Sequence, residues 1–196
     1  MLALASAKRV SELSALSREV SFQSGDAFLA YLPEFRAKTE SLRNPLPRKF
    51  RLKSLTALVG RSSPDRLVCP VRALKFYLQA TKDLPRRPRN LFVAVCNKER
   101  ALSRQAVSFL ISKTIAMTHE SFRDEDCKVL KVNAHQVRGV ATSLNVWRNK
   151  QVCRVLDAAT WKCSSVFSKH YLKDVERTFK DGYTLGPVIA AGDLVT

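Results

Sequence analysis

The sequence predicts a mainly α fold of the α+β class, with a small antiparallel β-sheet near the N-terminus. Short β-forming segments separated by turn residues fill positions 17–55, whereas apolar residues recur at helical spacing from about position 70 onward. The chain has 196 residues, 45% of them hydrophobic, which is enough for one folded core. We expect a single domain over residues 1–181 and a tail of small and apolar residues over 182–196.

The first sixteen residues, MLALASAKRVSELSAL, predict a helix, because they are rich in helix formers and their apolar residues recur at roughly helical spacing. Arg9 and Glu12 lie one turn apart on this helix. Taken alone, this spacing is typical of a solvated ion pair, which stabilises a helix by roughly a few tenths of a kcal/mol.

The stretch from Ser17 to Leu55 predicts three or four short antiparallel strands. Its β-forming segments are REVSFQ, AFLAYLP, EFRAKTES and RKFRLKSL. A turn at Ser24-Gly25-Asp26 separates the first two segments, and two prolines precede the last.

Capping residues mark the helices of the remaining chain. Pro70 is suited to the first position of a helix, and Ser103 and Asn133 are suitable N-caps for two more. The helix after Asn133 is expected to end near Trp147. A further helix, KQVCRVLDAAT, follows, and the last is expected to begin near Ser164.

The charge balance predicts a polyanionic partner. The 34 Lys and Arg residues against 17 Asp and Glu give a net charge of +17. Because the basic residues are spread over several elements, nucleic acid, double-stranded DNA included, is the leading candidate for this partner and a membrane surface is not. Seven cations against one acid, Glu40, lie between positions 36 and 53. The residues expected to face DNA are Arg36, Arg43, Arg48, Lys49, Arg51 and Lys53, together with Arg86, Arg87 and Arg89 in the loop KDLPRRPRN, which could equally be a solvated loop.

The five cysteines predict neither a disulfide framework nor a zinc site, since their number is odd and no two form a C-x-x-C pair. A reducing, intracellular location is expected. The sequence also has no apolar run of about 18 residues, the length of a membrane span.

An H-x-x-R motif, NAHQVRG, is the centre of the functional prediction. His135 and Arg138 are three apart, so a helix would present both side chains on one face, where they could bind one anion. Trp161 and Tyr171 follow in TWKCSSVFSKHYL. An imidazole, a guanidinium, an indole and a phenol around one anion indicate phosphoryl chemistry with tyrosine as the nucleophile.

Four segments together resemble the catalytic domain of the tyrosine recombinases and integrases, and are most similar to those of eukaryotic mobile elements of the DIRS and crypton kind. AKRVSELSAL resembles the family's first arginine box, and FRAKTES resembles the strand that bears its lysine. NAHQVRG resembles its H-x-x-R box, and TWKCSSVFSKHYL its His/Trp and tyrosine segment. The four occur in the family's order over residues 9–171.

The resemblance implies that Tyr171 attacks a DNA phosphodiester, forms a 3′-phosphotyrosyl link and releases a 5′-hydroxyl. It also implies that Arg9 and Arg138 hold the two non-bridging oxygens of that phosphate. Guanidinium groups suit this role, because they keep their charge and can bind two oxygens at once.

The remaining roles follow from the same resemblance. Lys38, on a hairpin, would protonate the departing 5′-oxygen, although Lys49 and Lys53 are alternatives on neighbouring strands. His135 would assist removal of the tyrosine proton, and Trp161 would donate a hydrogen bond to the phosphate. The expected catalytic set therefore needs no cofactor and no metal ion.

The implied function is site-specific DNA recombination and integration of a mobile element in the nucleus, by protomers that assemble as a tetramer on DNA. A topoisomerase of type IB would share the chemistry without pairing two sites. Family members carry an N-terminal helical domain, whereas only eight residues precede Arg9 here. A truncated chain is therefore expected, and an inactive DNA-binding relic or domesticated fragment is the alternative function.

Overall fold

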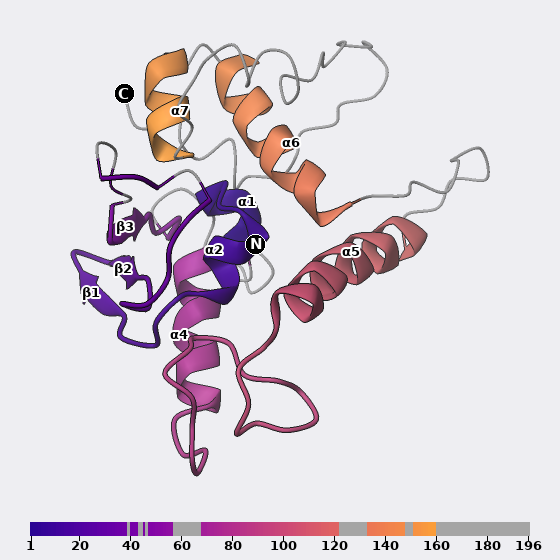
Figure 1. Ribbon diagram of the computed structural model, residues 1–196. Coiled ribbons are helices and arrows are strands. Elements are labelled where there is room, and N and C mark those ends of the chain that lie inside the picture. The colour runs from indigo at the N-terminus through magenta and orange to yellow at the C-terminus, as the bar shows by residue number, and fades with distance from the viewer. Residues whose placement is uncertain are drawn as a thin grey trace.

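The protein combines helices with one small sheet in this computed structural model, which confirms the α+β class (Figure 1). The structure describes residues 1–38, 40–42, 45, 47–56, 68–121, 133–147 and 151–159. The elements are α1 (Leu2–Ser6), α2 (Val10–Ser14), β1 (Ser21–Gln23), β2 (Asp26–Ala30), β3 (Lys49–Leu52), α4 (Pro70–Ala80), α5 (Arg104–Ser121), α6 (Ala134–Trp147) and α7 (Val152–Ala158). The predicted last helix and the tail over 182–196 lie outside the described residues.

The sheet has three antiparallel strands in the order β1-β2-β3. Ser24 and Gly25 form the turn between β1 and β2, with φ angles of 50° and 87°. Two successive residues with positive φ match the twist of a two-residue hairpin, so the predicted turn is confirmed.

Three of the predicted three or four strands are present, and the segment EFRAKTES is not one of them. The described residues between β2 and β3 form no regular strand there. Glu40 explains the irregular path, because its carboxylate accepts the backbone N–H of Ala37 at 3.0 Å and binds Arg36 and Arg48. These local bonds close a loop and replace the pairing that a strand would make.

The N-terminal segment forms two short helices rather than the one predicted helix. Ala7 adopts a left-handed conformation with φ 50°, and its N–H donates to the carbonyl of Ala3 at 3.1 Å, which ends α1. The backbone N–H of Arg9 then donates to the Glu12 carboxylate at 2.8 Å, which begins α2. The break turns α2 away from the direction of α1 (Figure 1).

The three predicted helix starts are confirmed. Pro70 is the first residue of α4. The Ser103 hydroxyl accepts the N–H of Ala106 at 3.1 Å at the start of α5. The Asn133 side chain accepts the N–H of His135 at 3.1 Å at the start of α6, which ends at Trp147 as predicted.

The core lies where the sheet meets α2 and α4. Leu16, Leu29, Leu52 and Leu91 are fully or almost fully buried there, and Val71 of α4 packs in the same cluster.

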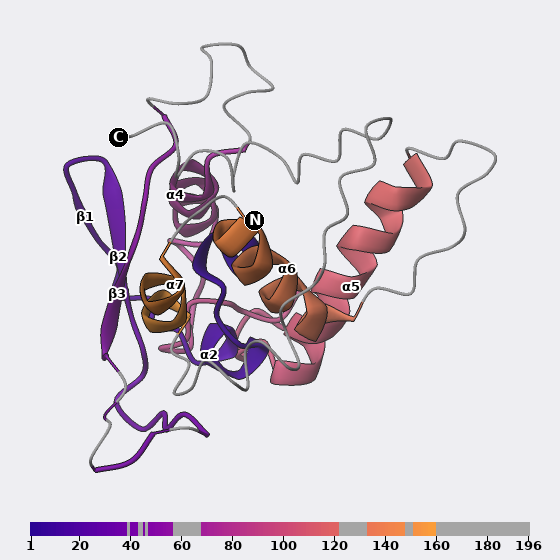
Figure 2. The ribbon, with the colours of Figure 1, turned by 90° about the horizontal axis from the view of Figure 1, so that it is seen from above.

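The sheet flanks one side of the helices, and α7 lies next to β3 in both views (Figures 1 and 2). α6 packs against α1, α5 and α7, so the H-x-x-R helix is held directly over the N-terminal segment. Within the described parts of the chain, none of the helices has the length and apolar character to span a membrane.

Candidate active site

The carboxylate of Glu12 is the centre of a buried polar cluster. Its side chain is 0% exposed, and its Oε2 lies 3.4 Å from Nη1 of Arg138 and 3.9 Å from Nη1 of Arg9. The hydroxyl of Tyr31 donates to Oε1 at 3.3 Å. Glu12 therefore joins α2, α6 and the end of β2, although Arg138 is 126 positions away in the sequence. The predicted solvated ion pair between Arg9 and Glu12 is wrong, because the carboxylate is buried.

The cluster brings together Arg9 and Arg138, the two arginines that the resemblance pairs on one phosphate. Arg138 is 3% exposed, and its Nη2 also donates to the carbonyl of Ala159, just after α7. The Arg9 side chain is 25% exposed, so this guanidinium borders the surface. One carboxylate thus orients two guanidinium groups, one facing the interior and one the surface.

Tyr31 is a member of the cluster that the sequence analysis missed. Burial raises the pKa of its phenol, and the neighbouring Glu12 carboxylate raises it further. Tyr31 therefore stays protonated at neutral pH and serves as a hydrogen-bond donor. Its AFLAYLP context shows only a β-forming segment, and nothing in it signals that a partner lies in another segment.

His135 lies near the same two arginines. Partial burial lowers the pKa of its imidazole, and the positive charges of Arg138 and Arg9 lower it further. A neutral imidazole at physiological pH can accept a proton, which is what a base requires. The residue is exposed at the start of α6, where Asn133 fixes its backbone.

Lys8 is a second residue that the sequence analysis missed. Its side chain is buried, with Nζ 3.1 Å from the carbonyl oxygen of Ala158 and 5.1 Å from the centre of the Phe50 ring. Desolvation lowers the pKa of its ammonium, and Arg138 and Arg9 lower it further, whereas Glu12 opposes them. The only signal in the sequence was its position directly before Arg9.

Lys38, the predicted general acid, lies in the connection of the β2–β3 hairpin, but no strand bears it as the resemblance implied. The Lys38 side chain is exposed. Among the described residues it has no hydrogen-bonding or charged partner. Trp161 and Tyr171 lie outside the described residues, so the assembled members of the predicted set are Arg9, His135 and Arg138.

The cluster carries an excess of positive charge. Among the described residues, Lys8, Arg9 and Arg138 all interact electrostatically with the carboxylate of Glu12. Like charges held close together raise the free energy of the site, and a bound anion lowers it. The arrangement is therefore suited to a phosphate, whose oxygens would accept from the guanidinium groups.

The residues predicted to face DNA have two different environments. Lys49, Lys53, Arg86 and Arg89 are exposed, as a phosphate-facing surface requires. Arg87 instead donates to the carbonyl and hydroxyl of Thr81 and closes the end of α4.

The other arginines on the sheet side have acidic partners. Arg36 and Arg48 bind Glu40 at 3.2 and 2.8 Å, and Arg51 binds Asp26 at 2.5 Å. Their side chains are largely exposed, so they remain accessible to a polyanion. Arg43 lies outside the described residues.

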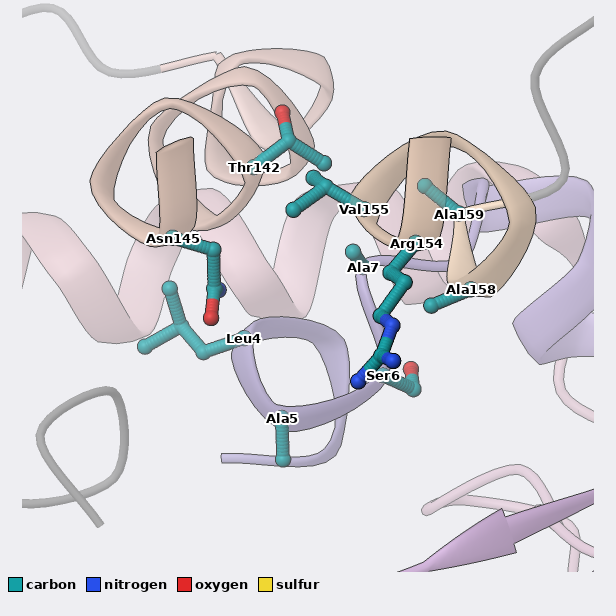
Figure 3. Close-up of a pocket in the computed structure, with 10 residues that line it drawn as sticks. All are labelled: Leu4, Ala5, Ser6, Ala7, Thr142, Asn145, Arg154, Val155, Ala158 and Ala159. Atoms are coloured by element: carbon teal, nitrogen blue, oxygen red, sulfur yellow. The ribbon is translucent and has the colours of Figure 1, made fainter. Parts of the chain in front are cut away.

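A cavity of about 260 Å³ lies beside the cluster, between α1, α6 and α7 (Figure 3). Ala158 and Ala159, whose carbonyls accept from Lys8 and Arg138, line it together with Thr142 and Val155. The side chain of Arg154, which also lines the cavity, extends towards Ser6 (Figure 3). The cavity therefore borders the end of α7 on the side that faces α1.

In the described ranges, no group of His, Cys, Asp and Glu side chains could hold a metal ion.

Comparison of the sequence with protein-family models finds no match, and comparison with curated proteins finds none either.

Proposed function

We propose that this chain cleaves and rejoins duplex DNA through a 3′-phosphotyrosyl intermediate, in the manner of a tyrosine recombinase that integrates a mobile element. The observation that carries the proposal is the placement of Arg9 and Arg138 on the buried carboxylate of Glu12, with His135 close enough for their charges to lower the pKa of its imidazole. These residues come from segments 126 positions apart, so tertiary folding creates the set.

In the proposed reaction the phenolic oxygen of Tyr171 attacks the phosphorus of a backbone phosphodiester. A phosphorus–oxygen bond forms to the tyrosine, and the bond to the 5′-oxygen of the next nucleotide breaks. His135 accepts the phenolic proton, and Lys38 gives a proton to the departing oxygen. Attack of a 5′-hydroxyl on the phosphotyrosine reverses each step and rejoins the strand without an external energy source.

The arginines stabilise the transition state of this reaction. Attack by the phenol places additional negative charge on the non-bridging oxygens, and prepositioned guanidinium groups stabilise that charge most strongly when they need not reorganise. Glu12 restricts the reorganisation, because it binds both guanidinium groups before DNA arrives. The lowered pKa of His135 keeps its imidazole unprotonated and ready to act as a base.

The second candidate function is DNA binding without cleavage. The burial of Arg138 and its bond to the Ala159 carbonyl favour this alternative, because a phosphate must displace or bypass that carbonyl to reach the guanidinium. The exposed cations near β3 and after α4 would bind DNA in either case.

A nicked suicide DNA substrate separates the two functions. The nick lets a short 5′-hydroxyl fragment diffuse away after cleavage, so the covalent protein–DNA adduct accumulates and is seen on a denaturing gel. We expect an adduct with the wild-type chain and none with Tyr171→Phe, while the control Tyr183→Phe behaves like the wild type. Salt-sensitive DNA binding by the wild type without any adduct would support the binding function instead. An adduct with Tyr171→Phe would refute the assignment of the nucleophile.

A further inference from the structure

Two neighbouring carbonyl groups at the end of α7 each accept a hydrogen bond from a cation of the cluster. The Ala158 carbonyl accepts from Lys8 at 3.1 Å, and the Ala159 carbonyl accepts from Arg138. The last carbonyls of a helix lack partners within the helix and carry its negative dipole end, so cations stabilise them. Lys8 and Arg138 are therefore connected through one short piece of backbone.

Among the described residues, the main helix packing of α7 is against α6. The helix has only seven residues, which is too short to be stable by itself. The 260 Å³ cavity leaves the end of the helix unfilled on the side of α1, as Figure 3 shows around Ala158 and Ala159. The hydrogen bond from Lys8 is thus one of the contacts that hold these carbonyls in position.

The environment of Lys8 is costly for a charge. The side chain is 7% exposed and its ammonium lies against the ring of Phe50 on β3. An apolar side chain would occupy such a place without the desolvation penalty of an ammonium. Unlike an apolar side chain, Lys8 forms a hydrogen bond that joins the segment before α2 to the end of α7, next to Phe50 of β3.

We propose that Lys8 is a positioning residue for Arg138, which it orients by fixing the end of α7. This inference rests on the proposed DNA cleavage. With the Ala158 carbonyl held by Lys8, the next carbonyl meets the Arg138 guanidinium from one side while Glu12 meets it from another. The guanidinium is fixed at two points before it meets a phosphate.

Lys8→Met removes the ammonium and keeps a side chain of similar length, whereas Lys8→Arg keeps a cationic donor. Lys75→Met is a matched control, since the Lys75 ammonium lies 4.9 Å from the centre of the Phe22 ring on the outer strand, away from the cluster. In single-turnover cleavage of the suicide substrate, we expect Lys8→Met to be slower by about 10- to 100-fold, the effect of a misplaced catalytic group. Lys8→Arg should retain most of the rate and Lys75→Met all of it.

A second substrate, with sulfur in place of the bridging 5′-oxygen, distinguishes positioning from proton donation. A departing thiolate needs no proton, so this substrate restores the rate of a variant that lacks the general acid. We expect no restoration for Lys8→Met and clear restoration for Lys38→Ala. Restoration of Lys8→Met would mean that Lys8 is itself the acid, and a wild-type rate for Lys8→Met would show that it positions nothing; either result overturns the proposal.

The dependence on pH gives a readout that loss of packing alone would not produce. The charged groups around Lys8 are Glu12, Arg138 and Arg9, and burial lowers the pKa of Lys8. The wild-type rate should therefore fall at a lower alkaline pH than the rate of Lys8→Arg, whose side chain stays charged. Identical alkaline limbs would contradict the proposal.

Hydrogen exchange tests the same contact without any cleavage. The amides of residues 152–159 should exchange faster in Lys8→Met than in the wild type, and Lys75→Met should leave them unchanged. If the wild type forms no adduct but this difference is present, the proposed function fails while the contact to α7 stands. If the amides of α7 exchange at the same rate in Lys8→Met and the wild type, the inference about Lys8 fails, whether or not the wild type forms an adduct.

Discussion

Glu12 and Glu40 are built into the protein in the same way, but their surroundings differ. Each carboxylate accepts a backbone N–H, from Arg9 at 2.8 Å and from Ala37 at 3.0 Å. Each also binds two arginines. Around Glu40 the arginine side chains are 75% and 41% exposed, whereas around Glu12 they are 25% and 3% exposed.

The difference shows that the position of the arginines in the fold determines the role of a carboxylate that binds two of them. Glu40 binds partners four and eight positions away, so it stabilises one local loop. Glu12 binds Arg138 across 126 positions, so it joins separate parts of the fold. Solvent screens the first set of charges, while burial keeps the second set strongly coupled.

Replacement of the central carboxylate should have the largest effect on stability. Glu12→Gln keeps the shape of the side chain but leaves Arg138 buried without its counter-charge, and loss of one partner of a buried pair costs about 3–5 kcal/mol. Urea denaturation followed by circular dichroism measures the loss in the free energy of unfolding. Glu40→Gln is the matched control, and we expect only a small shift of its midpoint. Equal losses in the two variants would refute the distinction between the two carboxylates.

Removal of the Tyr31 hydroxyl should have the next largest effect. Tyr31→Phe leaves Glu12 Oε1 without its 3.3 Å donor, and loss of a buried hydrogen bond to a charged group costs about 1–3 kcal/mol. The same denaturation experiment measures it. In a double-mutant cycle with Glu12→Gln the two losses should be non-additive, because both variants disrupt one bond. Additive losses would mean that the two side chains act independently.

Local signals in the sequence were enough to predict much of the fold. Pro70, Ser103 and Asn133 each begin a helix as predicted, because a cap depends on residues within one turn. The hairpin turn at Ser24-Gly25 is local for the same reason. The coarse fold class followed from these features together with the spacing of apolar residues.

The parts that the sequence analysis missed depend on long-range packing. The H-x-x-R spacing correctly placed His135 and Arg138 on one helix, but no local pattern indicates that Glu12 is buried under that helix. Tyr31 and Lys8 join the cluster only through tertiary contacts with α2 and α7. The left-handed break at Ala7 was missed because alanine is otherwise the best helix former.

The charge of Arg138 should have a measurable but smaller effect on His135. Partial burial and the two nearby arginines hold the pKa of the imidazole below its usual value of 6.5. Arg138→Met should raise this pKa towards 6.5, which an NMR titration of the imidazole protons measures. An unchanged or lower pKa in Arg138→Met would show that the two side chains are not coupled.

The sign of the pH effect on stability follows from the same pKa. The unfolded chain takes up a proton on His135 at a higher pH than the folded chain, so acidification through the interval between the two pKa values favours unfolding. Stability should therefore fall as the pH drops below 6.5 in the wild type. In Arg138→Met this part of the fall should shrink, because the interval narrows.

The smallest effect should come from Arg36, whose side chain is 75% exposed. The N–H of Ala37 is the main group that lowers the pKa of Glu40, and Arg48 also contributes, so both remain in Arg36→Met. We expect an NMR titration of Arg36→Met to show a slight rise in the pKa of Glu40, and we expect almost no change in stability. Salt at 1 M should remove most of the difference in stability between this variant and the wild type. Arg9→Met is the matched variant at Glu12. Its effect on stability should depend less on salt, because burial of the carboxylate limits screening. If 1 M salt suppressed the effects of Arg36→Met and Arg9→Met on stability equally, the arginines at the two carboxylates would be equally screened by solvent. The buried cluster would then not be a phosphate site formed before DNA binds.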